Sequence, residues 1–306
     1  YEGNSISVGI ERGQITKTDR TIDRGIGVRV QVNKAIGFAY TNITNNIQTI
    51  ETTIQKAINA AKASKPDENW KGFPQKKPYP NVERKVDKKI LELNSEDLVD
   101  IAARMIDSAI AVDKRVFPVE GGAGSGYGAN AIVNSNGISG FDEGTIIQCS
   151  LATLVNEQNM VTPICFEFDS AKDLRINPEW VGKETARLTM SSLETKNVET
   201  KTYKIILTQY ALQELLQYTF INSVKADNVE RNQSPFKNKL GEKVGSEVLN
   251  IYDDGLLPEG FHTGIFDAEG VPHQKTQLLN KGTLCNFLYD NYTAKKQNTE
   301  STGNSS

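Results

Sequence analysis

The C-terminal part of the chain, residues 240–306, is divided by closely spaced turn signals, and this pattern limits the folds that it can adopt. Only short apolar runs lie between the turns, from Val248 to Tyr252 and from Thr283 to Tyr289. Such runs are typical of short strands joined by tight loops rather than of long helices. The turn pairs are Asp254-Gly255, Glu259-Gly260, Glu269-Gly270 and Lys281-Gly282.

Polar residues are concentrated in the same turns, and loops rich in polar residues often carry binding or catalysis. The aspartate pair Asp253-Asp254 is one candidate, with the alternative that it only stabilises the end of a strand. The others are Asp267, Glu269 and the run Ser301-Thr302-Gly303. The residue types alone do not identify a substrate.

The whole sequence predicts an α+β protein with several domains, mostly antiparallel sheets, a few amphipathic helices and a β-rich C-terminal domain. We expect an N-terminal α/β domain at residues 1–64 and a linker or extended arm at 65–90, where prolines and charges are frequent. A middle α+β domain follows at 91–200, and the C-terminal domain covers 201–306.

Several local signals predict individual elements. Two strand-like runs, 25–32 and 35–39, flank Asn33-Lys34 and predict a hairpin with a two-residue turn. Apolar residues at helical spacing predict helices over 47–61 and 94–110, and Asn177-Pro178 predicts the start of another that ends near Leu193. The apolar run that begins at Thr202 predicts a strand.

The glycine-rich run from Gly121 to Gly128 has two interpretations. A phosphate-binding loop would need a glycine spacing that is absent here and a following helix, whereas strand-like residues follow this run. We therefore expect a flexible hairpin tip.

Composition excludes several classes of protein. The chain is 38% hydrophobic and 24% charged with a net charge of -3, which argues against a nucleic-acid-binding surface. Apolar runs of membrane-spanning length are missing, so no membrane partner is expected. Cys149, Cys165 and Cys285 are widely spaced and odd in number, so we expect neither disulfides nor a zinc knuckle, and a cytoplasmic location.

Five short motifs carry a resemblance to a known family. In order they are Lys239-Leu240-Gly241-Glu242, Asp253-Asp254-Gly255, the run from Phe266 to Pro272, Leu288-Tyr289-Asp290 with Thr293-Ala294, and Ser301-Thr302-Gly303-Asn304. Together they resemble the third domain of the TldD/PmbA family, which includes metallopeptidases and proteins called modulators of DNA gyrase. The resemblance implies that members continue beyond the last motif, so we expect residues missing at both ends of this chain, which begins with Tyr1.

One departure from the family pattern matters for chemistry. The TldD branch carries H-E-x-x-x-H, whose histidines bind zinc and whose glutamate can act as a base. Aligned on Leu215-Leu216, this chain has Gln217 and Asn222 at the histidine positions and Tyr218 at the glutamate position. The pattern resembles the metal-free PmbA or TldE branch, which implies no cofactor here and zinc in a TldD-like partner.

Two functional hypotheses follow. In the first, the chain is a metal-free subunit that pairs with a TldD-like chain or with itself. Its third domain binds a peptide or unfolded polypeptide, with the polar turn residues named above lining the groove. In the second, it is an autonomous hydrolase whose divergent metal site uses His262, His273 and nearby carboxylates.

Overall fold

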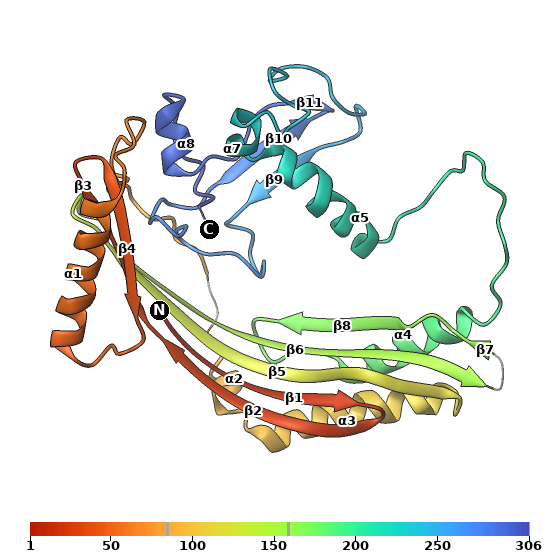
Figure 1. Ribbon diagram of the computed structural model, residues 1–306. Helices are drawn as coiled ribbons and strands as arrows, with labels where there is room; N and C mark the ends of the chain where they lie inside the picture. Colours follow the sequence, from red (N-terminus) through yellow and green to blue (C-terminus); the bar gives the residue numbers. More distant parts are fainter. Residues whose placement is uncertain (84–85, 158–159, 306) are drawn as a thin grey trace. The chain divides into compact units, whose positions relative to one another are not determined.

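The computed structural model describes residues 1–83, 86–157 and 160–305 (Figure 1). The chain forms two compact units. Unit 1 comprises residues 1–24, 84–130 and 143–200, and unit 2 comprises residues 25–83, 131–142 and 201–306. Both units combine helices with antiparallel strand pairs, which confirms the predicted α+β class. Within the described ranges, no helix is long and apolar enough to cross a bilayer.

Unit 1 is built on an antiparallel sheet with strand order β2-β1-β5-β6-β7, and β8 also pairs with β6. The N-terminal strand is therefore central, and its Val8 faces Ala123 of β5. The last residues of β5 and the first of β6 belong to unit 2. The strands are β1 (Glu2–Glu11), β2 (Gln14–Arg24), β5 (Val116–Val133), β6 (Ser139–Glu157), β7 (Met160–Val161) and β8 (Cys165–Ala171).

Helices cover one face of this sheet (Figure 1). The two longest are α3 (Ser95–Val112) and α4 (Pro178–Ser191), and a short α2 (Lys88–Glu92) precedes them. Asn94 caps α3 in a capping box with Asp97, and Asn177 caps α4, as their sequences predict. The buried core between helices and sheet includes Leu98, Met105, Val181, Ile147 and Leu151.

Helices α3 and α4 touch at Gly182, which is buried in the middle of α4. A Cβ atom added there would lie 2.2 Å from the carbonyl oxygen of Met105 in α3, well inside contact distance. Backbone atoms cannot yield as a flexible side chain can. Because Gly182 has no side chain, helices α3 and α4 can approach each other this closely.

The predicted hairpin tip at Gly121–Gly128 was wrong, because these residues lie inside the long strand β5. A Cβ on Gly122 would come 2.3 Å from the carbonyl oxygen of Val8 on β1, and one on Gly121 would come 2.4 Å from that of Ser150 on β6. Close contact with both neighbouring strands, rather than a turn, requires glycine here.

The three cysteines differ in accessibility, which gives a first testable prediction. Cys149 is buried in the core of unit 1, and burial raises the pKa of its thiol to about 12, whereas Cys285 is exposed. Because the thiolate is the reactive form, iodoacetamide at pH 8 should modify Cys285 first and Cys149 at least about a hundredfold more slowly. Mass spectrometry of the digested protein would measure both rates. Equal rates in the folded protein would contradict this packing.

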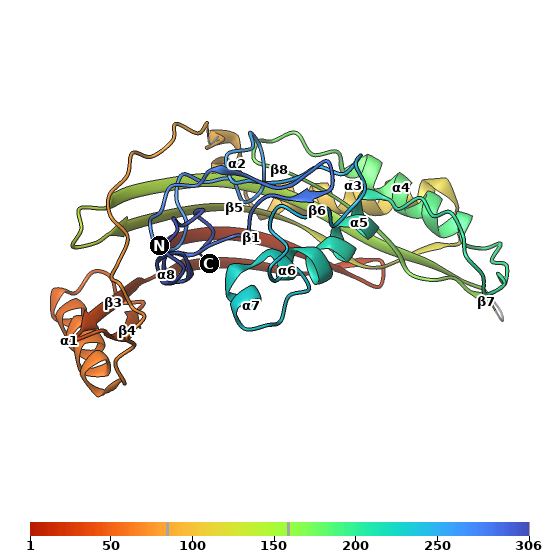
Figure 2. The ribbon, with the colours of Figure 1, turned by 90° about the horizontal axis from the view of Figure 1, so that it is seen from above.

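Unit 2 begins with the hairpin that the sequence predicts. Strands β3 (Ile26–Val32) and β4 (Ala35–Thr41) pair in register around Asn33 and Lys34, whose φ angles of 48° and 65° place both in the left-handed region. Helix α1 (Ile47–Ala63), capped by Asn46, packs against this hairpin (Figure 2).

The extended segment after α1 is covered by residues of its own unit. Trp70 is buried and stacks on Tyr292, with ring centroids 6.0 Å apart, and Tyr79 packs against Phe266 at 5.4 Å. Lys71 donates a hydrogen bond to the carbonyl oxygen of Lys295. These contacts join the early part of unit 2 to residues far along the chain.

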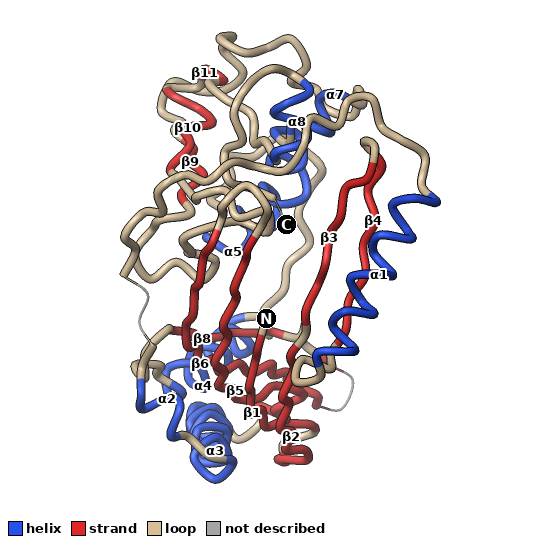
Figure 3. The backbone as a smooth tube through the Cα atoms, turned by 90° about the vertical axis from the view of Figure 1, so that its left-hand side faces the viewer, coloured by secondary structure: helices blue, strands red, loops and turns tan. Residues whose placement is uncertain are grey.

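The C-terminal part of unit 2 contains short elements connected by long loops (Figure 3). Its strands form a small sheet of order β11-β10-β9, and its core includes Phe220, Leu278 and Leu284. The elements are α5 (Gln209–Leu216), the π-helical turn η1 (Gln217–Ile221), α6 (Asn222–Val224), α7 (Ala226–Glu230), β9 (Ile251–Asp254), β10 (Lys275–Asn280), β11 (Thr283–Leu284) and α8 (Asn291–Lys296).

The strand predicted from Thr202 was wrong, since residues 202–207 belong to no strand of the described chain. Ile205 and Ile206 are 75% and 98% exposed there. High strand propensity does not make a strand without a neighbour to pair with. The two strands predicted after it were partly right: β9 begins at Ile251, and β11 is only two residues long.

Candidate functional site

The polar turns of the C-terminal region meet in one hydrogen-bonded cluster within unit 2. Its centre is Asp267, which is 4% exposed. One carboxylate oxygen accepts hydrogen bonds from the backbone N–H groups of Glu269 and Val271, both at 2.9 Å, and the other accepts the N–H of Ser305 at 3.0 Å. Asp267 thereby holds its own turn and ties the last motif to it.

Burial raises the pKa of the Asp267 carboxyl, and the three backbone N–H donors and His273 act in the opposite direction. A carboxylate that accepts several backbone N–H bonds serves mainly to fix the chain around it. Because Asp267 is buried and its oxygens accept these hydrogen bonds, little of its side chain is left to contact a peptide. Its place in a peptide groove stays a prediction.

Glu269 is also buried and links distant segments of unit 2. It accepts the backbone N–H of Asn291 at 2.9 Å, and its other oxygen lies 3.7 Å from Nη1 of Arg29 on β3. Burial raises the pKa of Glu269, and the charges of Asp267 and Asp290 raise it further. No local signal in the sequence points to the pairing of Glu269 with Arg29.

The Ser301-Thr302-Gly303 run is anchored to Tyr289. The hydroxyl of Ser301 donates to the carbonyl oxygen of Tyr289 at 3.0 Å, and the hydroxyl of Thr302 accepts the N–H of Tyr289 at 2.7 Å. Gly303 follows with a φ of 73°. These contacts fix the direction of the chain as it enters the cavity described next.

A cavity of about 230 Å³ lies at the C-terminal end of β9. It brings together both histidines of the chain, His262 and His273, with Asp253, Asp254 and Asn304. The other residues that line it are Gly255, Leu257, Gly260, Thr263, Gly303 and Ser305. The structure thus assembles five of the predicted candidates in one place, since Gly303 also lines the cavity.

The two aspartates of this cavity have different partners. Asp254 pairs with Lys275, with 3.0 Å between the carboxylate oxygen and Nζ. Asp253 instead accepts a hydrogen bond from the amide Nδ2 of Asn304 at 2.8 Å. The Asp254 charge is therefore balanced, whereas the partner of Asp253 is neutral.

The positions matched to the family's zinc motif lie elsewhere in unit 2. Gln217 and Tyr218 begin the π-helical turn η1, Asn222 begins α6, and all three are exposed. Amide and phenol groups are poor zinc ligands. Among the residues that the structure describes, no three His, Cys, Asp or Glu side chains are arranged to hold a metal ion. The side chains at these three positions therefore do not fit zinc.

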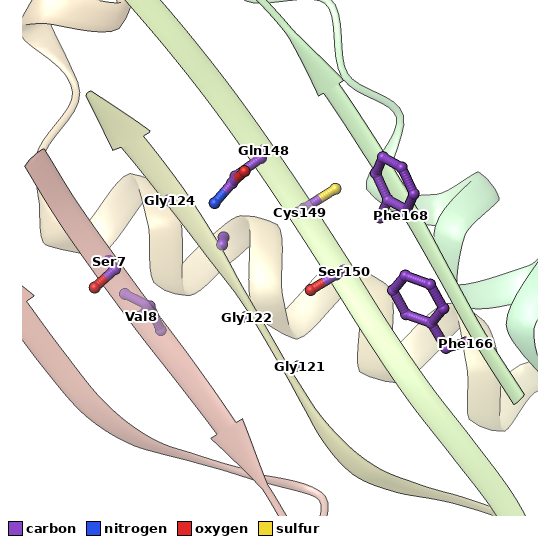
Figure 4. Close-up of a pocket in the computed structure, with 11 residues that line it drawn as sticks. Ser7, Val8, Gly121, Gly122, Gly124, Gln148, Cys149, Ser150, Phe166 and Phe168 are labelled. Atoms are coloured by element: carbon purple, nitrogen blue, oxygen red, sulfur yellow. The ribbon is translucent and has the colours of Figure 1, made fainter. Parts of the chain in front are cut away.

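Unit 1 contains a larger cavity, about 330 Å³, on its sheet (Figure 4). Small and uncharged residues of β1, β5 and β6 line it, including Ser7, Gly124 and Gln148, and the rings of Phe166 and Phe168 stand at one side. Its one titratable residue, Cys149, has a pKa raised by burial. This cavity offers little chemistry, so the cavity at β9 is the better candidate site.

The fold and the motif cluster define a multidomain α+β protein. Models described as the PmbA/TldA metallopeptidase domain 1, central domain and C-terminal domain match residues 1–63, 88–193 and 200–306. The chain belongs to the PmbA/TldD family.

The sequence similarity to known relatives extends over nearly the whole chain. An uncharacterised protein of Methanocaldococcus jannaschii is 30% identical over 98% of the chain and 68% of its own length. Metalloprotease PmbA of Escherichia coli O157:H7 is 26% identical over 97% of the chain and 66% of its own length. The chain thus spans about two thirds of the length of these relatives.

Solved structures show the same fold. TldE from Thermococcus kodakarensis is 26% identical, with a TM-score of 0.89 over 99% of this chain and 68% of that one. A modulator-of-DNA-gyrase protein from Thermotoga maritima has the same TM-score at 24% identity, over 99% of this chain and 68% of its own, and is evidence for the fold alone.

Proposed function

We propose that this chain is a metal-free, PmbA/TldE-like member of its family that binds peptide and supports a zinc-bearing TldD-like partner in proteolysis. The observation that carries the proposal is the donor set: Gln217, Tyr218 and Asn222 occupy the positions of the zinc motif, and the described residues provide no other metal-binding group of three. The similarity to a protein named TldE supports the same assignment.

The small sheet of unit 2 supports peptide binding. Strand β9 is at the edge of this sheet, with β10 on one side and no further strand of the described chain on the other. An edge strand presents unpaired backbone N–H and C=O groups, to which an extended peptide can add as a new strand. Asp253 and Asp254 lie at the end of this edge.

The charge of the chain and its cysteines support the remaining parts of the proposal. A net charge of -3 gives no basis for direct DNA contact, although a protein of similar structure is named a modulator of DNA gyrase. Cys149, Cys165 and Cys285 are all free thiols, which fits the reducing cytoplasm. Pairing with a second copy of the chain is the alternative to a TldD-like partner.

The test is to purify the full-length chain alone, measure its zinc by mass spectrometry, and assay peptide hydrolysis with and without a TldD-like chain from the same source. We expect no stoichiometric zinc and no hydrolysis by the chain alone, and at least about a tenfold rise in the partner's activity on mixing. A partner whose motif glutamate is changed to glutamine is the control and should stay inactive. An unchanged activity of the partner would overturn the supporting role.

One observation keeps the autonomous hydrolase as a second candidate: both histidines line the same cavity as Asp253 and Asp254. That hypothesis predicts stoichiometric zinc in the chain alone, and loss of zinc and hydrolysis in His262→Ala and His273→Ala. Zinc-free protein would exclude it.

A further inference from the structure

The cavity at the end of β9 contains an unbalanced negative charge. Lys275 neutralises Asp254, but Asp253 has no ionic partner among the residues that the structure describes. One oxygen of Asp253 accepts the amide of Asn304, and its other oxygen accepts no hydrogen bond from the described chain. The cavity is therefore suited to a positively charged group.

Asn304 orients this carboxylate. A carboxylate can only accept hydrogen bonds, so the NH₂ group of Asn304 must face Asp253 and its Oδ1 must face away. That Oδ1 is buried and, within the described residues, has no hydrogen-bond donor. The acceptor left for a ligand in the cavity is therefore the second oxygen of Asp253, and it fits a ligand that is cationic and carries N–H groups.

A metal ion does not meet this need, because no three ligating side chains are suitably placed in the described chain. An ammonium group does, since it carries one positive charge and three N–H donors. The volume, about 230 Å³, exceeds that of several water molecules at about 30 Å³ each, so a small residue bearing the ammonium group can enter.

We propose that this cavity binds the free N-terminal ammonium group of an extended peptide, through the carboxylate of Asp253. The inference rests on the proposed peptide binding along β9. Because the cavity lies at the C-terminal end of β9, a peptide with its first residue there and the rest along the strand runs antiparallel to β9. The site thus sets both the direction of the peptide and its register from the first residue.

The histidines give a direct readout of this cavity. The 306 residues contain two histidines, and both line the cavity. Imidazole NMR signals of the ¹³C-histidine-labelled protein therefore report on ligand binding there, and His262→Gln and His273→Gln identify which signal belongs to which ring. The probes are glycinamide, with a free amine, and N-acetylglycinamide, in which the amine is blocked.

We expect glycinamide to shift the histidine signals and N-acetylglycinamide to bind at least about tenfold more weakly. Asp253→Asn should weaken glycinamide binding by a similar factor. Glu247→Gln, which removes an exposed carboxylate outside the cavity, should leave it unchanged. Equal binding of the two probes to the unmodified protein, or no shift with either, would overturn the ammonium site.

A strand-forming peptide, Ala-Thr-Val-Thr-Val amide, and its N-acetylated form separate this inference from the proposed function. Tighter binding of the free-amine peptide would support both. Equal binding of the two peptides would leave peptide binding in place and overturn N-terminal recognition. Binding of glycinamide without binding of either peptide would support the ammonium site and remove the evidence for strand addition.

Discussion

Replacing Gly182 with alanine should lower the free energy of unfolding by about 2 kcal/mol, the reverse of the usual effect of this change inside a helix. Alanine favours a helix over glycine by about 1 kcal/mol. Here, however, the new Cβ would lie 2.2 Å from the carbonyl oxygen of Met105 and 3.0 Å from Cβ of Ser108. Helices α3 and α4 would have to separate, and overpacking of this kind costs about 1–3 kcal/mol or more.

The neighbouring residue provides a matched control. Lys183 is exposed on the same helix, so Lys183→Ala should change stability by no more than about 0.5 kcal/mol. Urea unfolding would give the free energies, and amide hydrogen exchange of α3 would localise the effect, since the two units need not unfold together. A Gly182→Ala protein that is more stable than the unmodified one would show that the helices do not approach so closely.

Replacing Asp267 with alanine should destabilise the C-terminal motif cluster by about 3 kcal/mol or more. The change removes the acceptor of three backbone N–H groups, those of Glu269, Val271 and Ser305, in a buried place. Each buried donor left without an acceptor costs about 1–3 kcal/mol. Relief of the buried charge offsets part of this loss, because burial already raises the pKa of Asp267.

Hydrogen exchange at those three amides is the direct measurement for Asp267→Ala, and protection should fall at all of them. Asp267→Asn should have an intermediate effect, because one oxygen remains for Glu269 and Val271 while an NH₂ group faces the N–H of Ser305. Asp100→Ala, at a largely exposed carboxylate of α3, is the control and should change little. Undiminished protection in Asp267→Ala would mean that the carboxylate does not hold the cluster.

Elements with a local cause could be predicted from the sequence. Asn33-Lys34 can adopt the left-handed conformations of a two-residue hairpin turn, and the structure has both residues there. The side chains of Asn94 and Asn177 accept hydrogen bonds from the first N–H groups of α3 and α4, and Pro178 has no N–H group that needs an acceptor. Neighbouring residues determine these features, so a pattern of a few positions is sufficient.

Features that depend on distant neighbours could not be predicted in this way. Gly121 and Gly122 signal a turn by composition, but two adjacent strands, one of them from the N-terminus, require them. The residues from Thr202 have the composition of a strand and find no strand to pair with in the described chain. In each case tertiary contacts outweigh local propensity.

In the candidate site, too, the sequence predicted some features and not those that depend on distant neighbours. The family motifs identified Asp253, Asp254, Asp267 and Glu269 as residues of one region, but not their different situations. Whether a carboxylate is buried under backbone N–H groups, as Asp267 is, or lines a cavity, as Asp253 does, depends on loops that meet only in three dimensions. Lys275 pairs with Asp254 and Asn304 with Asp253, and the spacing of these residues along the chain carries no signal.

The π-helical turn η1 lies where the alignment on Leu215-Leu216 puts the zinc motif of the family. In H-E-x-x-x-H the histidines are five positions apart, and on an α-helix five positions rotate a side chain to about 140° from its start. A π turn closes its hydrogen bonds over five residues and brings such positions into line. Here the side-chain amide of Asn222 reaches the carbonyl oxygen of Gln217 at 3.4 Å. The backbone here therefore brings positions five residues apart toward one side of the helix, although the side chains at Gln217 and Asn222 are poor zinc ligands.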